Sequence, residues 1–429
     1  MQNHFSKLGL QEPILQAIFD LKIENPTEIQ SKVIPVLLKN ETDIVALAKT
    51  GTGKTAAFAL PLLQLMNVDS QDIQAVILVP TRELGQQIAK NLEGFAKYLP
   101  KVSIATICGG VPIKPQIERL LNPTQIVVGT PGRLIDLIKR KAINISKTQY
   151  LILDEADEMV SILKESLDEI IAEIPKSHRT YLFSATMQGT IKQIIQNYLH
   201  KNVVEVEANM EVVGNNAIDH EYIVVNPEEK LDVLMHFLAS RSDERGIIFC
   251  KTKAAVNKLA KNLAINKFSS GALHGSLSQG IRDRIMEQFR NGHINILIAT
   301  DLASRGIDVP EVSYVVNYHL PDVSEAYVHR SGRTGRAGAN GFSLTVLQPE
   351  EIKEIPLFEK ELGIKFKKFE KPTLASINEN NVILWAKQIF KTKPNHEVSS
   401  GFKDKVKTVF HHLTKDELIE KLIANCLKK

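Results

Sequence analysis

The chain has 429 residues, of which 43% are hydrophobic and 24% are charged, and these values are ordinary for a folded globular protein. They exclude a mostly disordered chain, a collagen-like fibre and a disulfide scaffold, and the length favours two domains. The three cysteines form no CxxC pair, so we expect a reducing, cytoplasmic location. We expect neither a signal peptide nor a membrane span, because no apolar run approaches the roughly 18 residues that a span requires.

The net charge of +4 is unevenly distributed. From Glu351 to Lys429 there are 16 lysines, no arginine and 11 acidic residues, so this stretch has a net charge of +5 and the remainder −1. If the near-neutral body binds nucleic acid, it therefore does so through particular residues. The lysine-rich tail could attract phosphate without reading sequence, or it could be a solvated helical face.

Short apolar runs alternate with helix-like segments along most of the chain. Runs of this length, apolar throughout, are typical of strands buried on both faces, and their alternation with helices predicts parallel α/β sheets. The runs lie at residues 43–47, 75–79, 125–128, 150–153, 181–183, 246–249, 295–298, 314–316 and 342–346.

This alternation is interrupted once, at a polar stretch with a Gly-Asn-Asn turn signal, which we predict to be a linker at 209–218. We therefore expect one α/β domain at 1–208, a second at 219–365, and a helical, basic extension at 366–429. Three segments of the extension place apolar residues on one helical face. The last of them begins with a capping box at Thr414–Glu417.

A glycine-rich loop follows the run at 43–47 and precedes a helical segment. Phosphate binding requires glycines that let backbone N–H groups surround the phosphates, a lysine for the β- and γ-phosphates, and a hydroxyl for Mg²⁺. Lys54 and Thr55 supply the last two. The predicted phosphate-binding residues are Thr50, Gly51, Thr52, Gly53, Lys54 and Thr55.

An acidic tetrad, Asp154-Glu155-Ala156-Asp157, follows the run at 150–153. An aspartate at the end of a strand holds Mg²⁺ in P-loop NTPases, and an adjacent glutamate can orient and deprotonate the attacking water. The alternative is a solvated helix N-terminus, where acidic residues are favoured by the helix dipole. Together with the glycine-rich loop, the tetrad favours a nucleotide-hydrolysing site in which Thr55 and Asp154 hold the metal.

An arginine-rich stretch, 329–336, lies in the second predicted domain. The planar guanidinium group binds phosphate with two hydrogen bonds, and an arginine from another domain can act as an arginine finger worth roughly 10³–10⁵ in rate. Arg333 and Arg336 are the candidates for this role. The alternative is a flexible basic loop.

On these motifs and their order, the chain resembles the DEAD-box ATP-dependent RNA helicases of superfamily 2, in particular bacterial members with a short helical C-terminal extension. The resemblance implies two tandem RecA-like domains, ATP and Mg²⁺ as cofactors, and Lys54, Asp154, Glu155, Arg333 and Arg336 as the catalytic residues. It also implies that Gln30 recognises adenine with help from Phe5 and that Gly306 and Asp308 approach the ribose. The family's Gly-aromatic pair before this motif is Lys22-Ile23 here, which leaves only an aliphatic face for the base.

The resemblance further assigns residues to RNA and to the coupling of ATP state with unwinding. Their predicted positions past strand ends place them at the binding edge of an open α/β sheet. The RNA-contact residues would be Thr81, Arg82, Gly110, Thr130, Gly132, Arg133, Thr252, Gly275, Arg282, Thr300 and Arg305. The coupling residues would be Asp157, Ser184, Thr186 and His329; Ser184 could also cap a helix.

The function implied is RNA-stimulated ATP hydrolysis coupled to local strand separation and RNA remodelling through closure of the two domains. Two alternatives remain open: an ATP-gated RNA clamp that hardly turns over, and a DNA helicase with the same core. The resemblance also implies ribonucleoprotein or ribosome-assembly partners. The extension could form a homodimer, grip RNA non-specifically, or pack back on the second domain.

Overall fold

The computed structural model describes most of the chain, including both sheets and the last two helices. The described residues are 4–39, 42–48, 52–187, 189–200, 202–208, 218–301, 312–335, 340–371, 379, 382–383, 385–386, 389–390, 392 and 399–427. The predicted linker therefore lies outside them, except for Ile218, which begins a strand.

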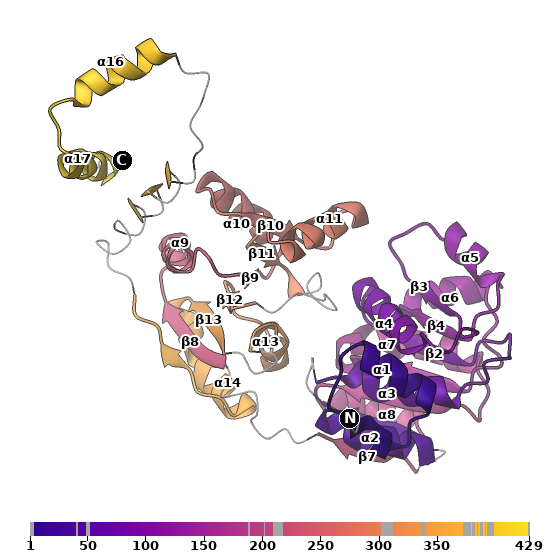
Figure 1. The fold of residues 1–429 in the computed structure, drawn as a ribbon. Coiled ribbons are helices and arrows are strands. Elements are labelled where there is room, and N and C mark those ends of the chain that lie inside the picture. The colour runs from indigo at the N-terminus through magenta and orange to yellow at the C-terminus, as the bar shows by residue number, and fades with distance from the viewer. Residues whose placement is uncertain are drawn as a thin grey trace.

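The first sheet has seven parallel strands in the order β3-β4-β2-β5-β6-β1-β7 (Figure 1). They are β1 (Ile44–Leu47), β2 (Ala75–Leu78), β3 (Ile104–Ile107), β4 (Ile126–Gly129), β5 (Tyr150–Leu153), β6 (Arg179–Ser184) and β7 (Val204–Glu207). The helices around it are η1 (His4–Leu8), α1 (Glu12–Asp20), α2 (Glu28–Lys39), α3 (Lys54–Leu65), α4 (Arg82–Phe95), α5 (Lys114–Leu120), α6 (Pro131–Lys139), α7 (Ala156–Ala172) and α8 (Gly189–Tyr198).

The second sheet repeats this architecture in the order β10-β11-β9-β12-β13-β8-β14, again with parallel pairing. Its strands are β8 (Ile218–Val224), β9 (Gly246–Phe249), β10 (Ser270–Leu273), β11 (Ile296–Ala299), β12 (Tyr314–Asn317), β13 (Gly341–Leu347) and β14 (Lys367–Lys368). The helices are α9 (Lys230–Ser240), α10 (Lys253–Ile265), α11 (Gln279–Arg290), α13 (Ser324–Ser331), η2 (Pro349–Glu354) and α14 (Ile355–Leu362). The prediction of two parallel α/β sheets is thus confirmed.

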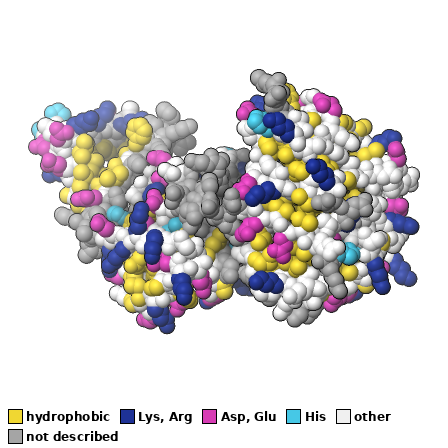
Figure 2. Space-filling model, turned by 90° about the horizontal axis from the view of Figure 1, so that it is seen from below, with side chains coloured by type: hydrophobic (Ala, Val, Ile, Leu, Met, Phe, Trp, Pro, Cys, Tyr) yellow, Lys and Arg dark blue, Asp and Glu magenta, His cyan; other side chains and the backbone are white. Residues whose placement is uncertain are grey.

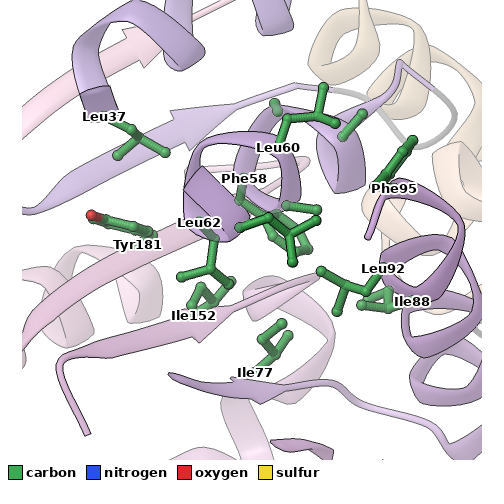
Figure 3. Close-up of a cluster of buried hydrophobic side chains, with 14 of the residues drawn as sticks. Leu37, Phe58, Leu60, Leu62, Ile77, Ile88, Leu92, Phe95, Ile152 and Tyr181 are labelled. Carbon is green, nitrogen blue, oxygen red and sulfur yellow. The ribbon is translucent and has the colours of Figure 1, made fainter. Parts of the chain in front are cut away.

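Each sheet is covered by helices on both faces, because alternate residues of its central strands point in opposite directions. Ile77 and Ile152 pack with helices α2, α3 and α4, and Figure 3 shows these side chains around Phe58. Val76 and Leu151, their sequence neighbours, pack with α6, α7 and α8 on the other face. The second sheet likewise has one core cluster on each face.

The extension contains the helices α16 (Ser400–Phe410) and α17 (Lys415–Leu427), which stand apart from both sheets (Figure 1). The predicted capping box is confirmed, because Thr414 N donates to Glu417 Oε2 (2.8 Å) and Glu417 N donates to Thr414 Oγ1 (3.2 Å). None of the residues of these two helices is buried, so their apolar stripes are exposed. Among the described residues, no helix is both long and apolar enough to cross a membrane.

Candidate functional site

The glycine-rich loop leads from β1 into α3 and is tied to the segment before α2. Gly53 is the N-cap of α3 with φ of 87°, a left-handed conformation that favours glycine. Its carbonyl accepts a hydrogen bond from Gln30 Nε2 (3.0 Å), while Gln30 Oε1 accepts from Thr27 N (2.9 Å). A β-carbon at position 53 would lie 2.2 Å from Gln30 Nε2 and would displace the amide from its hydrogen bond to Gly53 O. The predicted phosphate residues Thr50 and Gly51 lie outside the described residues.

Lys54 and the first two acids of the tetrad form a buried group of charges. The Lys54 ammonium is inaccessible to solvent and has no hydrogen-bond partner among the residues that the structure describes. Burial raises the pKa of Asp154 to about 7; the charge of Lys54 opposes this shift, and the neighbouring Glu155 carboxylate adds to it. Glu155 Oε2 is also buried without a hydrogen bond in the described part of the chain. Such orphaned groups are costly unless a ligand or cation satisfies them.

These residues fit a nucleoside triphosphate with a divalent cation. The buried ammonium can bind phosphate oxygens, and the backbone N–H groups at the start of α3 are oriented as in other anion sites at helix N-termini. The Asp154 carboxylate and the Thr55 hydroxyl are oxygen ligands of the kind that Mg²⁺ prefers. A cation there would also stabilise the charged form of Asp154, which burial disfavours.

Glu155 is held in an unusual backbone conformation. Its φ of 51° and ψ of 49° lie in the left-handed region, and it is the N-cap of α7. A residue other than glycine in this region costs roughly 1–2 kcal/mol. In this conformation Glu155 N donates a hydrogen bond to Oδ1 of Asp154 (3.0 Å).

Asp157 connects the tetrad to the segment Ser184–Thr186 and to the second domain. Its Oδ2 accepts hydrogen bonds from Ala185 N (3.1 Å), Thr186 N (3.1 Å) and Thr186 Oγ1 (3.2 Å). The same oxygen lies 3.7 Å from His329 Nε2 on α13. Burial raises the pKa of Asp157, but His329, Lys54 and Thr186 outweigh burial and lower it to about 2. The four predicted coupling residues are therefore adjacent in the structure, since Ser184 Oγ also donates to Thr186 O (2.7 Å).

The arginine-rich stretch is anchored by a residue that the sequence reasoning did not single out. Arg330 is buried and donates to both carboxylate oxygens of Asp301 (2.5 and 2.7 Å), and also to Asn317 Oδ1 and His319 O. This anchoring fixes the end of α13, and Arg333 follows it in a buried position. Burial lowers the pKa of Arg333, and the opposing charges are those of Glu155 and Glu158. The charges of Glu155 and Glu158 in the first domain thus act on Arg333 of the second, whereas Arg336 lies outside the described residues.

The predicted RNA-contact residues of the first domain lie past the carboxyl ends of neighbouring strands. Thr81 follows β2 and caps α4 by accepting from Leu84 N (3.3 Å). Thr130 follows β4, and its Oγ1 accepts from Gly109 N (3.3 Å). Arg133 Nη2 donates to Val111 O (2.9 Å), which joins the loop containing Gly110 to the segment containing Gly132. Arg82 begins α4. The structure therefore brings these residues to one edge of the sheet.

In the second domain the corresponding residues also follow strand ends. Thr252 caps α10 by accepting from Ala255 N (3.1 Å), and Thr300 N donates to Leu273 O (3.3 Å). Apart from the residues next to it in the chain, no atom of the described residues lies within 4 Å of where a β-carbon of Gly275 would be, so its backbone is open to a close approach. Gly306, Asp308 and Arg305 lie outside the described residues.

Two predicted residues have surroundings that the sequence did not suggest. Arg282 Nη2 lies 3.0 Å from Glu83 Oε1, and Gln279 Nε2 donates to the same oxygen (3.2 Å). Because Glu83 is on α4 and the others are on α11, these contacts join the two domains. Phe5 is packed into the core of the first domain and is only 1% exposed, so its contact with adenine remains a prediction.

The sequence reasoning also missed Glu158, the residue after the tetrad. Its Oε1 lies 3.4 Å from His329 Nε2, across the domain interface. Glu83 and Gln279 were likewise not assigned. The sequence pointed to these three residues only by their position, since each lies within three residues of a predicted site residue.

Three family models match the chain in succession. They are described as DEAD/DEAH box helicase (residues 27–194), helicase conserved C-terminal domain (229–338), and probable ATP-dependent RNA helicase, helical domain (377–429). Among curated proteins, the DEAD-box ATP-dependent RNA helicase CshA of Geobacillus kaustophilus is 35% identical over 431 residues, covering 99% of this chain and 89% of that protein. The ATP-dependent RNA helicase DeaD of Mycobacterium tuberculosis is 39% identical over 386 residues, covering 90% of this chain and 68% of that protein.

Solved structures show the same two-domain arrangement. Dbp5 of S. cerevisiae, bound to RNA and ADP BeF3, matches with a TM-score of 0.79 and 31% identity, over 91% of this chain and 100% of that one. Mss116p, bound to ssRNA and AMP-PNP, matches with a TM-score of 0.78 and 26% identity, over 99% of this chain and 89% of that one. The chain belongs to the DEAD/DEAH box helicase family, and its two sheets are the two RecA-like domains of that family.

Proposed function

We infer that this chain is an ATP-dependent RNA helicase that hydrolyses ATP between its two RecA-like domains and uses their closure to separate RNA strands locally. One observation carries this inference. A buried lysine and two buried carboxylates of the first domain, Lys54, Asp154 and Glu155, lie at the interface reached by His329 and Arg333 of the second.

The chemistry follows from the placement of these groups. Lys54 would bind the β- and γ-phosphates, and Thr55 and Asp154 would hold Mg²⁺, which would neutralise phosphate charge. Glu155 orients the attacking water and accepts its proton. Arg333, with Arg336, stabilises the charge that develops on the transferred phosphoryl group. Because Arg333 belongs to the second domain, this constellation is complete only when the domains are closed.

RNA binding would favour the same closed state through a separate set of contacts. Described residues among the predicted RNA contacts, such as Thr81, Thr130 and Thr252, lie past strand ends of both sheets, so one strand of RNA can contact both domains only when these are close together. RNA and ATP then favour the same conformation, which is the basis of a reciprocal coupling between them. Hydrolysis removes the γ-phosphate contacts and allows the domains to part.

The test is the steady-state ATPase activity of the full chain with single-stranded RNA, with matched DNA, and with no nucleic acid. We expect strong activation by RNA and not by DNA, and loss of turnover in Glu155→Gln with ATP and RNA binding retained. Near-normal hydrolysis by Glu155→Gln would disprove the catalytic assignment. Equal activation by DNA would indicate a general nucleic-acid motor, and ATP-dependent RNA binding without turnover would indicate a clamp.

A homodimer through the C-terminal helices is a second proposal, supported by their exposed apolar residues. Figure 2 shows hydrophobic side chains exposed between Lys and Arg on one face of the molecule. On α16, Phe402 is 60% and Val409 is 75% exposed. Apolar stripes of this kind are typical of surfaces that bind another helix. Light scattering of the full chain should give a dimer mass that falls to the monomer mass in a Phe402→Asp, Val409→Asp variant; a monomer mass for the unmodified chain would exclude the dimer.

The cytoplasmic location also remains a proposal. Its support is that all three cysteines are free thiols, two of them buried, as is usual in a reducing compartment.

A further inference from the structure

The first turn of α7 places a second carboxylate against the other domain. Glu158 is buried, and its Oε1 lies 3.4 Å from His329 Nε2, slightly nearer than the 3.7 Å of Asp157 Oδ2. The side chains of His329 and Glu158 are 12% and 5% exposed. A carboxylate buried to this degree is stable only when a cation or hydrogen-bond donor faces it.

Asp157 and Glu158 have different surroundings. The near oxygen of Asp157 already accepts three hydrogen bonds from Ala185 and Thr186 of its own domain. Glu158 instead lines a small space with Asp301, His329, Arg330 and Arg333, all of the second domain. Asp157 therefore links the tetrad to Ser184–Thr186, whereas Glu158 is directed at the second domain.

Glu158 also lies near Arg333, with which it lines the same small space. The charges that stabilise the buried Arg333 guanidinium are those of Glu155 and Glu158. Arg330, which is fixed by Asp301, keeps the backbone near Arg333 in place, so the attraction of Glu158 acts on the direction of the Arg333 side chain. Two carboxylates from consecutive turns of one segment thus hold the arginine at the interface.

We propose that Glu158 is a positioning residue that stabilises domain closure, holding His329 together with Asp157 and keeping Arg333 beside Glu155. This role rests on the function proposed above. It is distinct from catalysis, because Glu158 acts through His329 and Arg333 rather than on the nucleotide.

The carboxylates around His329 make closure of the two domains depend on the protonation of this histidine. Burial lowers the pKa of His329, but the attraction of Asp157, Glu158 and Glu155 outweighs burial and raises it above its ordinary value. When the domains part, His329 leaves these carboxylates. Closure is therefore favoured fully below the ordinary pKa of histidine and weakens as the pH rises through the raised value. The charged groups around His329 are Glu155, Asp157 and Glu158 of the first domain and Asp301, Arg330 and Arg333 of the second, with Lys54 acting on Asp157.

Closure can be followed in the full chain by energy transfer between two dyes. Leu121 (80% exposed) and Ile265 (67% exposed) are suitable cysteine positions, one in each domain. Cys426 is replaced by serine, whereas Cys108 and Cys250 are buried, which raises the pKa of each thiol to about 12 and makes them unreactive. Energy transfer with AMP-PNP and single-stranded RNA is measured against pH, beside RNA-stimulated kcat and KM.

We expect Glu158→Gln to move the pH at which closure is lost, and the descending limb of the ATPase profile, about one unit lower. Glu158→Asp, which keeps the charge, should restore most of this shift. The matched control is Glu169→Gln, because Glu169 is an exposed acid on the same helix that pairs with Lys139 at 2.7 Å away from the interface. An unchanged midpoint in Glu158→Gln, or an equal shift in Glu169→Gln, would overturn the proposal.

A second variant keeps the test decisive if Glu158→Gln does not fold. His329→Gln removes the titrating group, so closure should lose its pH dependence in this range; an unchanged dependence would also overturn the proposal. If the unmodified chain closes on RNA and AMP-PNP but does not hydrolyse ATP, the proposed ATPase function fails. The shift in the closure midpoint still decides the role of Glu158.

Discussion

The contact between Arg282 and Glu83 predicts a measurable part of the closure energy. Two unit charges 3.0 Å apart attract by about 5 kcal/mol at an effective dielectric constant of ~20. Desolvation offsets most of this attraction, since the two side chains are only 17% and 16% exposed. We expect a net coupling of about 1–2 kcal/mol, or about 5- to 30-fold in the equilibrium between closed and open forms.

A double-mutant cycle on RNA-stimulated kcat/KM and on RNA affinity with AMP-PNP measures this coupling. Glu83→Gln and Arg282→Gln should each reduce kcat/KM and RNA affinity. The double variant should show little further reduction beyond that of either single variant. The exchanged pair, Glu83→Arg with Arg282→Glu, should recover part of the loss. Arg284→Gln is the matched control, because Arg284 is an exposed arginine on the same helix.

The alternative is the role that the sequence predicted for Arg282, a contact with RNA. In that case Arg282→Gln would weaken RNA binding by the same factor whatever residue occupies position 83. The exchanged pair would then bind RNA more weakly than either single variant. That combination of results would refute the ion-pair reasoning.

Three further predictions concern stability and the extension. Just after three helices, a lysine has a φ between 55° and 61°, where glycine is favoured; these residues are Lys22, Lys141 and Lys267. Replacing each by glycine should raise the free energy of unfolding by about 0.5–1 kcal/mol. Unchanged denaturation midpoints would contradict this prediction. The pKa of Asp154, raised to about 7, makes its buried charge destabilising at higher pH without metal. Asp154→Asn should therefore raise the melting temperature of the metal-free protein at pH 8 but not at pH 5. An equal rise in melting temperature at both pH values would show that the buried charge of Asp154 is not the cause. Deleting residues 371–429 should leave RNA-stimulated ATPase activity largely intact and weaken RNA binding at moderate salt, whereas an unchanged salt dependence would exclude a role for the basic tail.

The sequence predicted the central strands and missed the outer ones for one physical reason. Strands such as β5 are buried on both faces and read as continuous apolar runs. The unpredicted strands β3, β7, β10 and β14 lie at sheet edges, and β8 is next to an edge. Their residues are partly exposed and include polar side chains, so they give no apolar run.

The site was predictable where its residues are contiguous. The glycine-rich loop and the acidic tetrad each carry a set of residues with one predicted function within a short stretch, and in the structure the charge of Lys54 acts on Asp154. The pairs across the interface were not predictable in this way. Glu83 with Arg282, and Glu158 with His329, are far apart in sequence and meet only because two separately folded sheets face each other.

The left-handed conformation of Glu155 sets a limit on engineering this protein. The backbone of this residue costs stability, and glycine would remove that cost. Under the catalytic role proposed above, a library screened for heat resistance alone should be enriched in glycine at this position, and those variants would lose turnover. On that role, heat stability and turnover are opposed at a single residue, so a screen for more stable variants has to include an activity assay.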